Sequence, residues 1–147
     1  MGRFADFGMH VPACEIRERF TSERHPYERA ISLAYFRFGS RLERGRPSGS
    51  FPELLDETVK KGNCAGAVYY TIDGQVIVDD FIRYESLGAD LQRISQRIGV
   101  VIPDELPKAK TTYRQDQRPA RDILTTAQKE TVYSFCRTEF ELLGYER

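Results

Sequence analysis

The chain has 147 residues and a mass of 17.0 kDa, which predicts one domain over residues 1–147 with a sizeable core. Hydrophobic residues make up 40% and charged residues 30%, as in a globular protein rather than a disordered or fibrous one. Because 22 Lys and Arg balance 22 Asp and Glu, the zero net charge argues against a protein that coats nucleic acid, although a local basic patch stays possible. No stretch approaches the roughly 18 apolar residues of a membrane span, and the charged first residues lack the apolar core of a signal peptide.

The three cysteines indicate a reducing compartment. Cys14, Cys64 and Cys136 are odd in number and form no CxxC pair. Disulfide frameworks use even numbers of cysteines, and zinc sites use closely spaced pairs, so the sequence predicts neither. It also predicts no bound metal. We therefore expect a cytoplasmic protein.

The first part of the chain predicts a short strand and a long helix. The strand ends at about Phe20-Thr21. The helix lies within residues 23–46, with Pro26 in the first turn, where a helix tolerates proline best. The apolar face of this helix repeats at helical steps and consists of Ile31, Tyr35, Phe38 and Leu42. Glycines and prolines then predict a loop, at Gly45, Pro47, Gly49 and Pro52.

A second helix and a pair of strands follow. The helix covers residues 51–61 and ends at Gly62. Strands are predicted over residues 67–72 and 75–83, on either side of Asp73-Gly74, the strongest short signal for a β-hairpin. Because apolar residues lie on both faces of the second strand, we expect it inside a sheet that is covered on two sides.

Two further helices complete the pattern. Residues 87–98 carry one apolar face and end at Gly99. A polar, basic loop covers residues 103–122, and the last helix begins with the capping-box pattern of residues 125–128. Its apolar stripe consists of Val132, Cys136, Phe140 and Leu143. This order of elements predicts an α/β fold, with helices packed around a small, mostly parallel sheet.

The segment Arg24-His25-Pro26-Tyr27-Glu28-Arg29-Ala30-Ile31-Ser32 is the most informative part of the sequence. Arg24 follows a predicted strand and precedes a helix whose first turn has backbone N–H groups without intrahelical partners. Ser32 lies about two turns into this helix. A guanidinium, a hydroxyl and a helix N-terminus that converge on one point form a phosphate site. The alternative is a surface arginine and a helical serine that bind no ligand.

This segment resembles the R-x-P-x-[DE]-R-x-x-S signature of the sulfotransferases. In that family the Arg and the Ser, here Arg24 and Ser32, bind the 3′-phosphate of the sulfate donor PAPS, which leaves as adenosine 3′,5′-bisphosphate. Two later stretches are also similar to the family, Val78–Leu87 and the ending Phe140–Tyr145. Because the similarities occur in the family's order, the set is more specific than any one of them.

Within the family, the resemblance is closest to the carbohydrate sulfotransferases and their bacterial relatives, which implies a carbohydrate acceptor. The segment Tyr35–Gly39 fits this group. His10-Val11 resembles the segment that supplies the general base, so the resemblance implies that His10 removes the proton of the acceptor hydroxyl as its oxygen attacks sulfur. The alternative is an N-terminal histidine without a catalytic role.

The basic loop is a further candidate for ligand binding. Five basic residues face only Asp116 in this stretch, namely Lys108, Lys110, Arg114, Arg118 and Arg121. Tyr113 lies among them and could stack on a base. The resemblance implies that this is the donor-binding loop, in which Lys108, Lys110 and Arg114 hold the nucleotide. The alternative is a solvated loop without a ligand.

One part of the family pattern has no counterpart in this sequence. Sulfotransferases begin with a strand, a P-loop-like turn and a helix, and that turn holds the 5′-phosphosulfate. No segment of the chain resembles the turn. The resemblance therefore implies a truncated P-loop-NTPase-like sulfotransferase fold, equivalent to the C-terminal two-thirds of the family's domain.

Three functions stay open at this point. The first is a sulfotransferase that transfers sulfuryl from PAPS to a hydroxyl. The second is a non-catalytic relative that binds a nucleotide or anion, or serves as an interaction module. The third is a folded remnant without a ligand. Loss of the family's first strand and helix would expose strand edges and apolar surface. We therefore also expect a homodimer whose interface involves residues 3–20.

Overall fold

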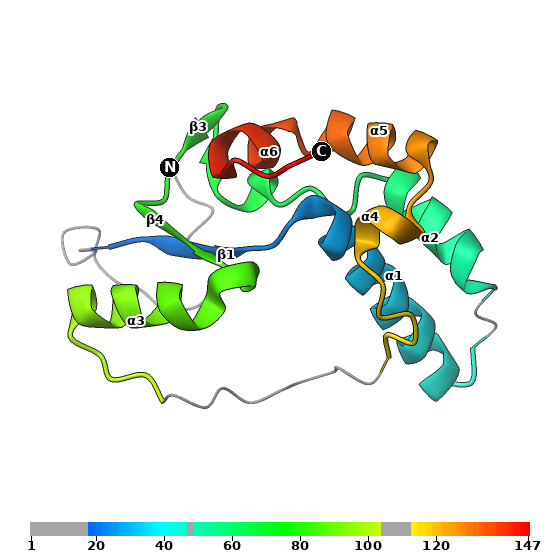
Figure 1. The fold of residues 1–147 in the computed structure, drawn as a ribbon, viewed down its shortest axis with the longest axis horizontal. Coiled ribbons are helices and arrows are strands. Elements are labelled where there is room, and N and C mark those ends of the chain that lie inside the picture. The colour runs from blue at the N-terminus through cyan, green and yellow to red at the C-terminus, as the bar shows by residue number, and fades with distance from the viewer. Residues whose placement is uncertain (1–17, 47–48, 104–112) are drawn as a thin grey trace.

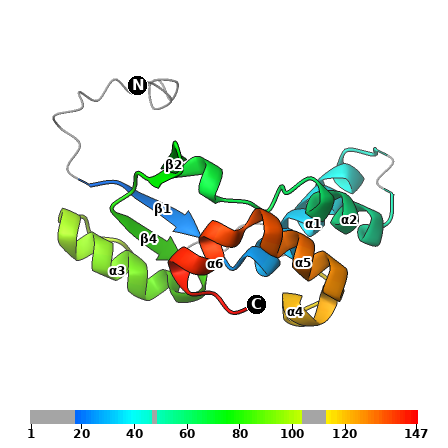
Figure 2. The same ribbon diagram turned by 90° about the horizontal axis from the view of Figure 1, so that it is seen from above.

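The structure, a computed structural model, describes residues 18–46, 49–103 and 113–147 and has the expected α/β character (Figure 1). Strands β1 (Phe20–Glu23) and β4 (Asp80–Arg83) pair in parallel along their whole lengths. Helix α3 (Leu87–Ile98) packs against β4. The other helices lie toward the carboxyl end of the strand pair (Figures 1 and 2). These helices are α1 (Pro26–Glu43), α2 (Phe51–Lys60), α4 (Ala120–Ile123), α5 (Thr126–Phe135) and α6 (Arg137–Leu143).

The strands are shorter than the sequence predicts. The predicted strand at 67–72 begins instead with a 3₁₀ turn, η3 (Ala67–Tyr69), and only β2 (Thr71–Ile72) is extended. The Asp73-Gly74 turn is confirmed, because both residues have positive φ angles, 51° and 76°. It joins β2 to the equally short β3 (Gln75–Val76).

The prediction that residues 75–83 form an internal strand was wrong. The chain leaves the hairpin after β3 and enters the separate parallel pair at β4, whose partner among the described residues is β1 alone. Ile82 is the buried residue of β4, while Ile72 and Val76 in the hairpin are exposed. Apolar β-branched residues on both strand faces therefore reflect strand propensity here rather than burial on two sides.

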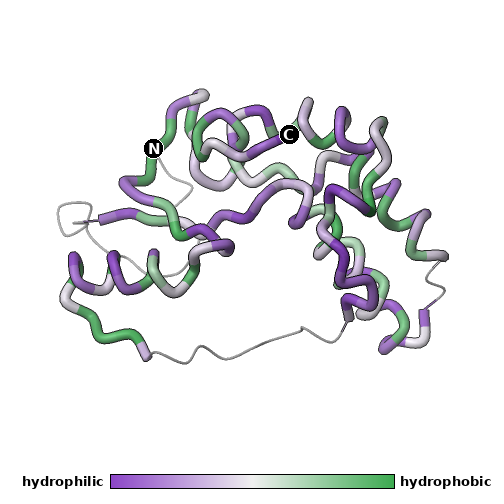
Figure 3. The backbone as a smooth tube through the Cα atoms, viewed as in Figure 1, coloured by the Kyte–Doolittle hydropathy of each residue, from purple (hydrophilic) through white to green (hydrophobic). Residues whose placement is uncertain are grey.

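The helices agree well with the sequence. Helix α1 begins at Pro26 and α3 covers residues 87–98. The expected capping box closes the start of α5, and a second one, which the sequence analysis did not predict, closes the start of α2. The predicted last helix is divided at Cys136 into α5 and α6, and the short helix α4 lies within the predicted basic loop. Hydrophobic and hydrophilic stretches follow one another along the helices, as expected where one face of a helix is buried (Figure 3).

The main core surrounds α1. Its buried face packs against α2, α4 and α5, and it includes Tyr27, Ala30, Ile31, Ala34 and Tyr35. The apolar stripe predicted for the last helix also faces this core, with Val132, Cys136 and Phe140 buried. No helix in the described parts of the chain has the length and apolar character needed to span a membrane.

A buried polar cluster joins the strand pair to this helical core. Glu23, the last residue of β1, is 3% exposed and forms an ion pair with Arg29 of α1. Arg29 Nη1 also donates to the Cys64 carbonyl at 3.3 Å. Glu139 of α6 is fully buried and accepts the Gly66 N–H at 2.5 Å. Burial raises the pKa of Glu23, and the charge of Arg29 opposes that rise.

Gly66 is predicted to be intolerant of any side chain, because a Cβ there would collide with the Arg29 guanidinium and the Glu23 carboxylate. We expect Gly66→Ala to lower the free energy of unfolding by about 1–3 kcal/mol, the usual cost of overpacking. Gly88→Ala is the matched control, since a Cβ at Gly88 of α3 meets no atom within 4 Å. Denaturant unfolding of both variants provides the measurement, and equal stability of Gly66→Ala and the wild type would contradict the role of this cluster.

Candidate functional site

A cavity of about 660 Å³ lies between the start of α1 and residues 113–117. Arg24 and Tyr84 on its wall directly follow β1 and β4. Because the two strands are parallel, both residues lie at the same, carboxyl edge of the pair, where ligands of α/β proteins commonly bind. A second cavity of about 310 Å³ shares Arg24, Arg29 and Tyr84 with the first and reaches Glu23.

The structure brings together four of the seven residues that the sequence singled out. Arg24, Ser32, Tyr113 and Arg114 all line the larger cavity, although they come from two segments more than eighty residues apart. His10, Lys108 and Lys110 lie outside the described residues.

Arg24 is held at the cavity wall with hydrogen-bonding capacity to spare. Its guanidinium carbon lies 4.3 Å from the centre of the Tyr84 ring, and Nη2 is 3.5 Å from Glu28 Oε2. Its Nε is buried and has no hydrogen-bond partner among the described residues. An arginine placed in this way is suited to a bound anion, which would satisfy the remaining donors.

A side chain of the protein caps the N-terminus of α1, so fewer backbone N–H groups are open to a ligand beside Arg24 than the sequence suggests. His25 caps the helix: its Nδ1 accepts the Tyr27 N–H at 3.2 Å. Pro26, the first helical residue, has no N–H to offer. Anion binding at this point therefore depends on side chains rather than on the first turn of the helix.

Glu28 fastens residues 113–120 to α1. Its carboxylate accepts a hydrogen bond from Arg114 Nη1 at 2.6 Å. It accepts a second from the N–H of Ala120, the first residue of α4, at 2.7 Å. Burial favours the neutral acid, but the Ala120 and Arg114 hydrogen bonds outweigh it and lower the pKa of Glu28. Arg114 also donates to the carbonyls of Asp116 and Arg118. Arg114 therefore positions this segment, and each of its three guanidinium nitrogens already donates one hydrogen bond within the protein.

Tyr113 is seated directly on α1. A Cβ at Gly39 would lie 2.7 Å from Tyr113 Cγ, so the ring occupies the space that the glycine leaves. The Tyr113 hydroxyl donates to Glu43 Oε1 at 2.7 Å, and the Phe36 ring lies at a tilt with its centre 6.2 Å away. Phe36, Tyr69 and Tyr84 line the same cavity as Tyr113, which gives it a largely aromatic wall.

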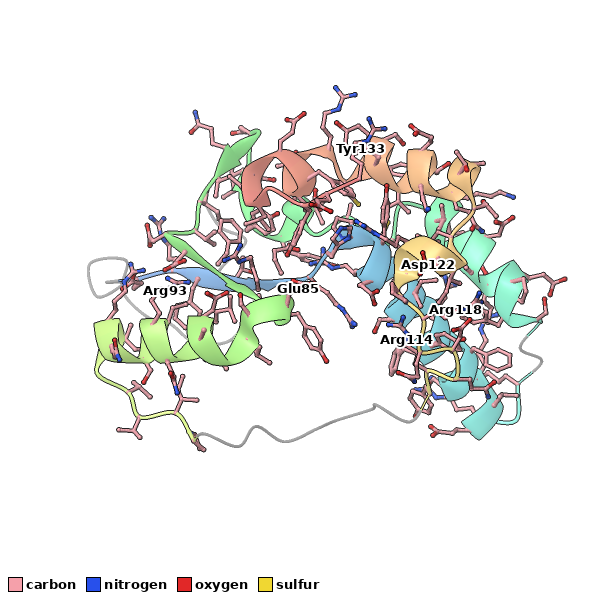
Figure 4. All side chains as sticks on the ribbon, viewed as in Figure 1. Glu85, Arg93, Arg114, Arg118, Asp122 and Tyr133 are labelled. Atoms are coloured by element: carbon pink, nitrogen blue, oxygen red, sulfur yellow. The ribbon has the colours of Figure 1, made fainter. Side chains whose placement is uncertain are left out.

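The remaining arginines of the basic loop are paired within the protein. Arg118 contacts Asp116 at 2.6 Å and Arg121 contacts Glu146 at 3.4 Å. In Figure 4, Arg118 and Asp122 lie beside Arg114 near α4, whereas Arg93 belongs to the distant α3. The charges of Arg118 and Arg121 are thus balanced locally, and neither residue lines the cavity.

Sequence reasoning missed Glu28, Arg29 and Tyr84. All three occur in the segments that carried the resemblance, at the [DE]-R positions of the signature and within Val78–Leu87. No family model matches the chain, and no curated protein or solved structure matches it significantly. Within the described ranges, no three His, Cys, Asp or Glu residues are arranged to hold a metal ion.

His25 makes the capped end of α1 sensitive to pH. Its ring lies among Tyr27, Phe140 and Tyr145. Because Nδ1 accepts a hydrogen bond, the proton of the neutral ring sits on Nε2, 2.9 Å from the Glu146 carbonyl. Burial lowers the pKa of His25.

We therefore expect stability to fall as the pH drops below about 6.5, the pKa of an unperturbed histidine. In this window the unfolded chain binds a proton that the folded His25 resists, so acid favours unfolding, while above it His25 is neutral in both states. His25→Asn retains an N-cap acceptor without titrating. Its denaturation midpoint should change less than that of the wild type between about pH 7 and 5. Glu23 titrates in both proteins, so parallel profiles would contradict the role of His25.

Replacing Glu28 tests the attachment of residues 113–120. Glu28→Gln removes the charge that Arg114 and the Ala120 N–H share, and we expect a loss of about 1–3 kcal/mol in the free energy of unfolding. Hydrogen exchange should rise within residues 113–120 in particular. Glu141→Gln on the exposed side of α6 is the matched control. Unchanged exchange in this segment would show that Glu28 does not fasten it.

Proposed function

We propose that this chain binds adenosine 3′,5′-bisphosphate, or its sulfated form PAPS, in the 660 Å³ cavity at the carboxyl edge of β1 and β4. The observation that carries the proposal is the meeting of Arg24 and Ser32, from the sulfotransferase-like signature, with Tyr113 around one cavity. The volume lies within the usual range of small-molecule sites, about 300–1,000 Å³.

The two ends of the cavity suit the two parts of such a ligand. Arg24, whose side chain lines the cavity, and the Ser32 hydroxyl are the groups proposed to hold the 3′-phosphate. Tyr113 and Phe36 supply aromatic surface against which an adenine ring can pack. Lys108 and Lys110 are proposed to contact the nucleotide from the same loop. Arg114 orients Tyr113 by holding the segment to Glu28.

The reaction that the resemblance implies is sulfuryl transfer from PAPS to a carbohydrate hydroxyl. In-line transfer needs positive charge on the sulfuryl oxygens and a base on the acceptor, for which His10 is the candidate. The sequence offers no counterpart of the turn that holds the 5′-phosphosulfate. We therefore propose nucleotide binding as the function of these residues, in a sulfotransferase-like fold, and expect little or no sulfuryl transfer by this chain alone. Homodimer formation stays a prediction.

Calorimetric titration with adenosine 3′,5′-bisphosphate tests the proposal. Arg24→Ala should weaken binding by about 1.5–3 kcal/mol, roughly 10- to 150-fold, as expected for charge-assisted hydrogen bonds. Adenosine 5′-monophosphate lacks the 3′-phosphate, so its affinity should change little in the same variant. Gly39→Ala should weaken the binding of both nucleotides, because the added Cβ displaces the Tyr113 ring.

Arg137→Ala is the control for this titration, since Arg137 lies on α6 and lines neither cavity. Its affinities should equal those of the wild type. Absence of both heat and thermal stabilisation at millimolar nucleotide would refute the proposal. An equal loss of affinity for the two nucleotides in Arg24→Ala would show that Arg24 does not contact the 3′-phosphate.

A further inference from the structure

Two of the three cysteines, Cys64 and Cys136, lie in contact inside the protein although 72 residues separate them in the sequence. Their Sγ atoms are 3.6 Å apart, and both side chains are fully buried. Cys64 belongs to the turn that follows α2, and Cys136 is the residue between α5 and α6. A bond between the two sulfur atoms would therefore join the end of one helix to the junction of two others.

The surroundings distinguish the two thiols. The Cys136 S–H donates to Cys64 Sγ, and this hydrogen bond, assisted by the charge of Arg29, lowers the pKa of the Cys64 thiol against the effect of burial. Interaction with Cys64 and burial raise the pKa of Cys136. Cys64 is thus the sulfur that becomes a thiolate more readily, and the thiolate is the nucleophile in cysteine oxidation.

We propose that Cys64 and Cys136 form a reversible disulfide when a small peroxide oxidises the folded protein. The Cys64 thiolate attacks one oxygen of hydrogen peroxide, which gives a sulfenic acid on Cys64 and releases hydroxide. The Cys136 sulfur then attacks Cys64 Sγ. The S–S bond forms as the sulfenic oxygen leaves, and the thiol protons convert both departing oxygens to water. Two thiols and one peroxide give one disulfide and two waters.

The folded protein already meets the main geometric requirement. The sulfur atoms must approach from 3.6 Å to about 2.05 Å, a short movement for a turn residue. Asn63 and Ala65, the chain neighbours of Cys64, line the 310 Å³ cavity, which brings a small oxidant close to this turn. The bond would restrict the unfolded chain over the long segment between the cysteines and so favour the folded state. The inference depends on none of the nucleotide contacts.

The test uses the full chain with Cys14→Ser, so that only the proposed pair can cross-link. Hydrogen peroxide is added to the folded protein near neutral pH. We expect the mass to fall by two hydrogen atoms, a non-reduced peptide map to link residues 64 and 136, and the Tm to rise by roughly 5–15 °C. Dithiothreitol should reverse all three changes. This variant leaves the buried pair intact.

Single replacements in the same background separate the two steps. Cys136→Ala removes the S–H donor, so Cys64 should oxidise more slowly and stop at the sulfenic acid, which dimedone traps. Cys64→Ala should give no dimedone adduct. An unchanged mass in the Cys14→Ser protein would overturn the proposal. A cross-link that forms only in denaturant, or oxidation of Cys64 to the sulfinic acid without a cross-link, would overturn it as well.

Discussion

The buried ion pair between Glu23 and Arg29 is the constraint on which the site depends. A carboxylate that is only 3% exposed is strongly unfavourable unless a charge partner accompanies it. Arg29 provides that charge from the first turns of α1 and also reaches the Cys64 carbonyl. Together these contacts fix the end of β1, the start of α1 and the turn after α2 relative to one another. Arg24 follows Glu23 directly, so its place at the cavity is a consequence of this pair.

The segment Arg24–Ser32 has both structural residues and residues that line the cavity. Glu28 fastens residues 113–120, and Arg29, which also lines both cavities, neutralises Glu23. His25 closes the helix N-terminus. Arg24 and Ser32 face the cavity. A single nine-residue segment can therefore both build the wall of a site and supply its polar groups, because a helix presents different residues to the core and to the outside.

The local elements could be predicted from the sequence because their signals are local. Helical periodicity, proline in a first turn and capping boxes act within a few residues, and α1, α2 and α3 occur where these signals place them. Strand length was overestimated, since β-branched residues favour extended backbone without specifying a partner strand. The kink at Cys136 carried no local signal. Charge counts also do not show which arginines of the basic loop are paired within the fold, as Arg118 and Arg121 are.

The sequence by itself therefore determined helices α1, α2 and α3, the Asp73-Gly74 turn, and Arg24 and Ser32 as two polar residues near the start of one helix. Only the tertiary structure decided that Tyr113 and Arg114 join them, that Glu28 and Arg29 are structural, and that Cys64 meets Cys136. The physical reason is distance along the chain. Contacts between segments seventy to ninety residues apart arise from burial and packing of whole elements, which no short-range pattern of residue types encodes.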